Sequence, residues 1–159
     1  MPFRGKALDP APSCSRCGIV LAHPVAFRFS VAVVRETTEG VSVEVESFFV
    51  PEQSDAVLDR YVFAYRIRIS NGSEATVQLT RRHWYIAEAD GSVREVEGEG
   101  VVGEQPVMAP GECHEYMSGA ILQGPVGSMY GTYLMRRDDG STFQATIPKF
   151  VLQMPRTLH

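Results

Sequence analysis

The chain lacks any hydrophobic run long enough to cross a bilayer, and it carries little excess charge. No apolar stretch approaches the roughly 18 residues that a spanning helix needs, and "CGIVLAHPVAF" (17–27) is interrupted by His23 and Pro24. The formal net charge of −4 over 159 residues gives no electrostatic reason to expect nucleic acid or an anionic membrane as a partner. We therefore expect a cytoplasmic protein that binds neither nucleic acid nor membrane.

Cysteine is also scarce, which restricts disulfide and metal chemistry. Three cysteines are too few for a disulfide framework. Cys14 and Cys17 form a single C-x-x-C, but structural zinc needs four ligands and the chain offers no second pair at that spacing. Cys113 precedes His114, and adjacent residues of a strand point to opposite faces, so these two side chains cannot act on one another. We predict no metal site and no cofactor.

Helical periodicity is missing too, and after residue 30 apolar and polar residues alternate instead. "VSVEVES" (41–47) and "RYVFAYRIRIS" (60–70) show the period of two that is typical of strands with one buried face. Asp90-Gly91 and Asp139-Gly140 are strong signals for hairpin turns. The pattern predicts an all-β sandwich of two antiparallel sheets with seven or eight short strands.

The first part of the chain has a different composition. Residues 1–33 contain four of the ten prolines and an excess of basic side chains, and no periodic pattern runs through them. We expect an N-terminal extension at 1–33, either flexible or the product of a start codon assigned too far upstream. Residues 34–159 are expected to form a single domain.

The segment "GEGVVG" has the spacing G-x-G-x-x-G, with glycines at Gly98, Gly100 and Gly103. In a dinucleotide-binding fold this motif follows a buried strand and opens a helix, whose N-terminus binds the pyrophosphate. Here Pro106 and Pro110 follow, and they prevent a helix of useful length. Two interpretations remain: a turn that needs glycine for its backbone, or a nest of amides that binds an anion.

Several long segments, in order, resemble the bacterial ApaG proteins. They are "RYVFAYRIRISN", "VQLTRRHWYI", "EVEGEGVVGEQPVMAPGECHEYMSG" and "FVLQMPRTLH". The resemblance covers about residues 34–159 and implies an immunoglobulin- or fibronectin type III-like sandwich. It also implies an association with cobalt tolerance and magnesium efflux. Related domains of eukaryotic proteins look like protein-interaction modules, and the resemblance assigns no catalytic residue.

A group of basic and aromatic residues is the strongest candidate for an interaction surface. If the strands at 60–70 and 75–87 form a hairpin through "NGSEA", their arginines would lie close together and form a planar, aromatic-rimmed surface. The same surface could bind a phosphate, or it could be an ordinary solvated face. Its members are Arg66, Arg68, Arg81, Arg82, His83 and Tyr85.

Neither catalysis nor metal binding has a convincing set of residues. Alternation places Trp84 inward and His83 outward, away from any nucleophile. Glu95, Glu97 and Glu99 share one face of a strand; such a row could hold a hydrated cation weakly, but it is more typical of a charged sheet edge. We therefore expect a non-catalytic module that binds an unidentified protein partner. The alternative is a sensor that binds nucleotide, pyrophosphate or a divalent cation near the glycines.

Overall fold

The computed structural model describes residues 30–156, which form nine strands and two single-turn 3-10 helices. The C-x-x-C of Cys14 and Cys17 and the expected extension up to residue 29 lie outside the described residues, whereas residues 30–33, which were also assigned to the extension, belong to the first strand. No helix of the described part is long and apolar enough to cross a membrane. The strands are β1 (Ser30–Thr38), β2 (Val41–Phe49), β3 (Tyr61–Asn71), β4 (Val77–Glu88), β5 (Val93–Glu99), β6 (Val107–Met108), β7 (Cys113–Leu122), β8 (Val126–Arg137) and β9 (Thr142–Gln153), and the helices are η1 (Pro51–Gln53) and η2 (Ala56–Leu58).

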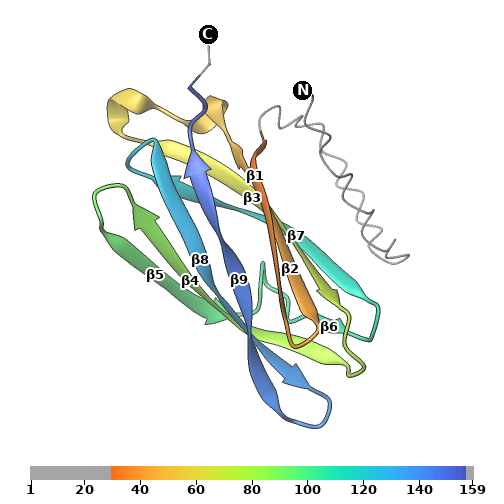
Figure 1. Cartoon of the computed structure of the whole chain (residues 1–159). Helices are drawn as coiled ribbons and strands as arrows, with labels where there is room; N and C mark the ends of the chain where they lie inside the picture. Colours follow the sequence, from red (N-terminus) through yellow and green to blue (C-terminus); the bar gives the residue numbers. More distant parts are fainter. Residues whose placement is uncertain (1–29, 157–159) are drawn as a thin grey trace, which may run out of the picture.

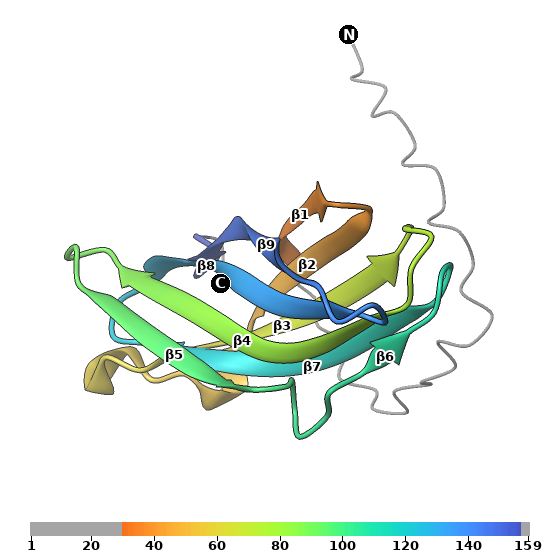
Figure 2. The same cartoon turned by 90° about the horizontal axis from the view of Figure 1, so that it is seen from below.

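The strands form two sheets that pack face to face (Figures 1 and 2). One sheet has the order β1-β2-β3-β7, and the other has the order β5-β4-β8-β9, with β6 paired to the beginning of β4. Every pairing is antiparallel. The predicted antiparallel sandwich is confirmed. Its strands number nine instead of seven or eight, because no strand was expected at 30–38 and the two residues of β6 are too few to show a pattern.

The alternating apolar residues form the core between the sheets. Val41, Val43 and Val45 of β2 are fully buried, and every second residue of β3 from Phe63 to Ile69 is buried as well. The opposite sheet contributes Trp84, whose ring packs edge-on against Tyr133 and Phe150. Strands that bury one face against another sheet in this way satisfy the period-two pattern.

Strand β4 changes the face that it buries half-way along its length. Val77 and Leu79 are buried at odd positions, but Trp84 and Ile86 are buried at even positions. The change comes from a β-bulge: Leu79 pairs with Met135 and Arg81 with Leu134, so Thr80 is an extra residue. A bulge of this kind re-aims every side chain that follows it.

The two long sides of the sandwich differ. On one side β9 packs along β1 and β2, and hydrogen bonds connect the sheets directly: the Thr146 amide donates to Thr38 Oγ1 (3.1 Å) and Ser47 Oγ donates to the Val151 carbonyl (3.3 Å). On the other side the edge strands β5 and β7 belong to different sheets and do not pair with each other. Arg94 Nη2 of β5 bridges this second side by donating to the Ile121 carbonyl of β7 (3.0 Å), and a partly open cavity lies between the sheets there.

Three loops use the same turn chemistry, an Asn or Asp followed by Gly and Ser. In each loop the first side chain accepts hydrogen bonds from the amide and the hydroxyl of the serine two residues later, as seen for Asn71, Asp90 and Asp139. The serine bonds lower the pKa of the Asp90 and Asp139 carboxyls. The two Asp-Gly hairpins are confirmed, since they connect β4 to β5 and β8 to β9.

Asn71 differs from its two counterparts because it is buried and joins separate segments. Its Nδ2 donates to the carbonyls of Ala75 (2.8 Å) and Met108 (2.9 Å). We expect Asn71→Ala to lower the free energy of unfolding by about 2–4 kcal/mol, because one buried and one partly buried carbonyl lose their donor. Chemical denaturation measures this loss. The exposed Asp90→Ala serves as the control, and an equal loss in both variants would contradict the buried role of Asn71.

Candidate functional site

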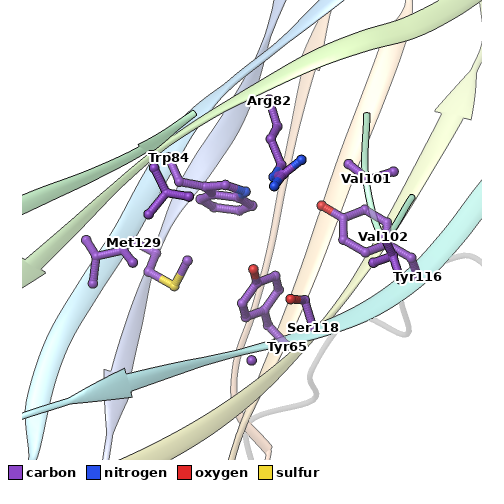
Figure 3. Close-up of a pocket in the computed structure, with 11 residues that line it drawn as sticks. Tyr65, Arg82, Trp84, Val101, Val102, Tyr116, Ser118 and Met129 are labelled. Carbon is purple, nitrogen blue, oxygen red and sulfur yellow. The ribbon is translucent and has the colours of Figure 1, made fainter. Parts of the chain in front are cut away.

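The open side of the sandwich contains a cavity of about 350 Å³ between the two sheets. Its apolar wall includes Trp84, Ile86 and Met129, and its polar groups come from Arg82 on β4 and from tyrosine and serine side chains on β3 and β7 (Figure 3). Ligand sites in proteins are commonly cavities of roughly 300–1,000 Å³ with mainly apolar walls and a few convergent polar groups. This cavity is therefore the candidate site.

Arg82 is the one charged residue among those that line the cavity. The bulge at Thr80 places it on the same face of β4 as Trp84, so its side chain points between the sheets. Its Nη1 donates to the carbonyls of Glu99 (3.0 Å) and Gly100 (2.9 Å). The loop after β5 thus holds the guanidinium in place through charge-assisted hydrogen bonds.

Each glycine of the G-x-G-x-x-G motif has a structural reason. A Cβ at Gly98 would lie 2.9 Å from two nitrogens of the Arg82 guanidinium, so this position leaves room for the arginine. A Cβ at Gly100 would lie 2.2 Å from the Glu104 carbonyl oxygen, and φ there is +65°. Gly103 has φ of +77° in a tight turn between Val101 and Glu104, where Val102 also has a positive φ of 48°. These conformations favour glycine.

Three backbone amides of this loop, those of Gly100, Val101 and Glu104, are used within the fold. Gly100 donates to the Thr80 carbonyl (2.9 Å), and Val101 and Glu104 exchange hydrogen bonds of 2.8 and 3.0 Å. An anion-binding nest needs several amides that converge on one ligand. Here the loop instead directs two carbonyl oxygens at a cation, Arg82. The geometry supports the turn interpretation of the motif, and binding of pyrophosphate by the loop stays an untested prediction.

The hydroxyl groups in the cavity are neutral and point toward the guanidinium. Figure 3 shows the hydroxyls of Tyr65, Ser118 and Tyr116 around the space below Arg82. Burial raises the pKa of Tyr65, although a hydrogen bond with Ser118 and the charge of Arg82 oppose this effect. Burial also raises the pKa of Tyr116 and Tyr133, whose hydroxyls bond to each other. These phenols are hydrogen-bonding groups, not bases, at neutral pH.

The predicted surface of six basic and aromatic residues does not exist as a single surface. The hairpin between the strands at 60–70 and 75–87 is wrong, because β3 pairs with β2 and β7, and β4 lies in the other sheet. The chain turns from one sheet to the other at Asn71. Arg66 and Arg68 lie on the outer face of the first sheet, Arg82 lines the cavity, and Arg81, His83 and Tyr85 lie on the outer face of the second sheet.

Acidic residues surround the arginines of the first sheet. Arg66 forms an ion pair with Glu46 and a second one with Glu115, where Nε and Oε1 are 3.5 Å apart. Arg68 Nη2 approaches the sulfur of Cys113 at 3.9 Å. This face is therefore a network of opposite charges, in agreement with the simpler of the two interpretations offered for these residues.

The outer face of the second sheet carries a row of stacked rings, which we call the outer aromatic row: His83, Tyr85 and Tyr130. Ring centroids are 4.5 Å apart for the first pair and 5.2 Å apart for the second. Nδ1 and Nε2 of His83 lie 2.9 Å from Glu97 and 3.2 Å from Glu95. His83 faces outward and the acidic residues lie on edge strand β5, both as predicted.

His114 lies beside the glycine loop, on the other side from Cys113. Its ring is near Tyr116, and its Nε2 is 3.9 Å from a Glu104 oxygen. Burial lowers the pKa of His114, and the Glu104 charge opposes this shift. The described residues contain no group of three or more His, Cys, Asp or Glu side chains placed to hold a metal ion.

Comparison with known proteins identifies the family. The family model DUF525, described as the ApaG domain, matches residues 51–137. The chain belongs to the ApaG family. Protein ApaG of Nitrosospira multiformis is 54% identical over 119 residues, which is 75% of this chain and 94% of that protein. Protein ApaG of Thiobacillus denitrificans is 53% identical over the same shares.

Solved structures agree with this assignment. The crystal structure of an ApaA protein from Bordetella pertussis has a TM-score of 0.71 and 47% sequence identity, and it covers 74% of this chain and 95% of that one. An X-ray structure of a second structural-genomics target has a TM-score of 0.70 and 42% identity, with 76% and 91% covered. The β-sandwich is thus shared with proteins closely similar in sequence.

The cavity was missed from the sequence, although two signals for it exist. Tyr65 belongs to the alternating segment 60–70, for which one buried face was predicted, and neither Tyr116 nor Ser118 was singled out. The positions in "CHEYMSGAIL" that share a face with the buried Tyr116 include Ser118, a small polar residue where a large apolar one would fill the core. The shift from Val77 and Leu79 to Trp84 and Ile86 also signals that Arg82 points inward.

We expect Gly98→Ala to displace Arg82 from the loop. The new Cβ would lie 2.9 Å from the guanidinium nitrogens. Because this end of the side chain can move, we expect only a weakening of its partly exposed hydrogen bonds to the two carbonyls, which should cost about 0.5–1.5 kcal/mol of unfolding free energy. Denaturation monitored by Trp84, which lies beside Arg82 in the cavity, measures this change. Gly124→Ala is the matched control, because its Cβ would meet no atom within 4 Å. Equal stability of the two variants would contradict the role assigned to Gly98.

Proposed function

We propose that this ApaG-family chain is a non-catalytic binding module, and that the cavity beside the glycine loop binds a small ligand. The observation that carries the proposal is the convergence of one guanidinium and three hydroxyls on an otherwise apolar cavity of about 350 Å³. Hydrogen bonds within the protein fix the positions of these polar groups, and the groups keep further donors and acceptors for a ligand. This proposal corresponds to the alternative predicted from the sequence, a small-ligand sensor near the glycines.

The lining residues support binding without catalysis. None of them is an aspartate, glutamate, histidine or cysteine, so the usual general bases and activated nucleophiles are missing from the wall. The phenols are held neutral, since burial raises the pKa of Tyr65 and Tyr116. The groups that remain can hold and orient a ligand, which is the role we assign to them.

An amide NMR titration of the full-length protein tests the proposal. A panel of small neutral, anionic and cationic compounds, together with ATP, pyrophosphate, magnesium and cobalt, is added one compound at a time. We expect at least one compound to give saturable shifts at residues 98–104 and 116–119. Ser118→Phe should abolish these shifts by filling the cavity. Ser128→Phe should not, because Ser128 lies on the face of β8 opposite to Met129, which lines the cavity. The proposal fails if no compound shifts these amides.

A second candidate function is protein binding through the outer face of the second sheet. The observation in its favour is the outer aromatic row, which Arg81 flanks and over which Lys149 lies, 5.8 Å from the Tyr130 ring centroid. Aromatic and arginine side chains are enriched at protein interfaces. We propose that effects of this chain on cobalt tolerance or magnesium efflux, which membership in the family suggests, pass through such a partner or through the cavity ligand.

Variants on the outer faces of the two sheets test whether the outer aromatic row binds a protein partner. Proteins that copurify with the tagged full-length chain from its own cells are compared for Arg81→Ala and Arg66→Ala. If the outer aromatic row is the interface, Arg81→Ala weakens retention of a specific partner several-fold and Arg66→Ala does not. Retention unchanged in Arg81→Ala and in Tyr85→Ala would exclude this face.

A further inference from the structure

We infer that the cavity binds a small organic acid, with one carboxylate attached to an apolar body about the size of one ring. The inference rests on the proposed function and narrows it to one chemical class. It follows from three properties of the described residues that line the cavity: the single cation, the neutral hydroxyls and the apolar wall.

The single cation fits a single negative charge. Arg82 is the one charged side chain in the lining, and both loop carbonyls accept from its Nη1. No hydrogen bond from Nη2 to any residue of the described part competes with a ligand. A guanidinium presents several donors in one plane, which matches the two oxygens of a carboxylate. The loop therefore fixes the arginine by one edge and leaves the other donors for an acid.

The hydroxyls complete the polar end of the site. Tyr65 and Ser118 lie directly opposite each other in the register of β3 and β7, and their hydroxyls bond to one another. Together with Tyr116 they point toward the space in front of Arg82 (Figure 3). Because the phenols are neutral, they can donate to a carboxylate oxygen without adding negative charge to the site.

The remaining wall selects an apolar body. Trp84, Ile86 and Met129 form one side, and Val96 and Val101 approach from β5 and the loop. A flat or branched hydrocarbon group would contact the indole face and the thioether, which favour apolar and aromatic partners. A cavity of about 350 Å³ has room for one ring with a short acidic arm.

Polyphosphates and divalent cations fit this site poorly. One arginine cannot balance the several charges of pyrophosphate or ATP. The loop amides at Gly100, Val101 and Glu104 already donate to carbonyls within the fold. A cation would meet the positive charge of Arg82. The cavity thus differs in ligand class from the pyrophosphate site that G-x-G-x-x-G alone suggests.

Trp84 makes the test direct, because it is the one tryptophan of the chain and it lines the cavity. Its fluorescence is followed while phenylacetate is added to the full-length protein, with phenylacetamide as the neutral analogue of the same shape. We expect a saturable change with phenylacetate and binding at least tenfold weaker with phenylacetamide. Pyrophosphate should neither produce the change nor compete with the acid.

Variants assign the effect to the polar end of the site. Arg82→Gln should weaken phenylacetate binding roughly ten- to hundred-fold, since it removes a charge-assisted hydrogen bond. Tyr65→Phe should weaken it several-fold while keeping the ring in the core. Arg81→Gln, one residue away and on the outer face, is the matched control and should bind normally. If Arg82→Gln does not fold, the comparison of Tyr65→Phe with wild type and of the acid with its amide carries the test.

Each of the other outcomes overturns the inference. Equal binding of phenylacetate and phenylacetamide would leave a ligand cavity, as proposed above, but would exclude an acid as its preferred class. Tighter binding of pyrophosphate than of phenylacetate would show that the cavity prefers a phosphate to a carboxylate. If phenylacetate leaves Trp84 unchanged while another compound shifts residues 98–104 in the NMR titration, the inference fails and the proposed function stands.

Discussion

The bulge at Thr80 is the feature on which the candidate site depends. It changes the buried face of β4 from odd to even positions, so Arg82 and Trp84 face the other sheet and Arg81 faces solvent. The backbone of the same residue also anchors the glycine loop, because its carbonyl accepts from the Gly100 amide (2.9 Å) and from Gln105 Nε2 (3.0 Å). Its hydroxyl donates to the Leu134 carbonyl across β8 (3.1 Å). The inserted residue Thr80 therefore determines both the inward direction of Arg82 and the position of the glycine loop that binds it.

The glycine motif serves this arrangement in a way that its spacing does not reveal. In a dinucleotide fold the glycines bring backbone amides to a phosphate. Here they let a tight loop direct carbonyl oxygens at a guanidinium, and Gly98 provides the space that the arginine occupies. The loop is strained, since Val102 is a β-branched residue with a positive φ, a conformation that costs of order 1–3 kcal/mol. The same G-x-G-x-x-G spacing can therefore bind a negative phosphate through backbone amides in one fold and a positive guanidinium through carbonyl oxygens in another.

Much of the fold could be predicted because it depends on local signals. Alternation in β2 and β3 gives the buried faces, and the Asp-Gly pairs give two hairpins. The error at Asn71 has a physical origin, because "NGSEA" resembles a hairpin turn locally. The Asn71 side chain binds the carbonyls of Ala75 and Met108 instead, and the chain passes to the other sheet. No local pattern could show this, since Met108 is far along the sequence.

The candidate site was harder to predict for a related reason. Its residues come from β3, β4, β5, β7 and β8, and only the pairing of these strands brings them together. The two sheets pack together along β9 and β1, whereas β5 and β7 are bridged by the Arg94 side chain and the opening of the cavity lies between them. A collapsed core would bury more apolar surface, yet this opening keeps a guanidinium and several hydroxyls between the sheets, held by loop carbonyls rather than by a carboxylate. Sequences that keep polar groups where apolar packing would be more stable commonly do so at functional sites, and none of the described residues that line the cavity is a carboxylate that could pair with Arg82.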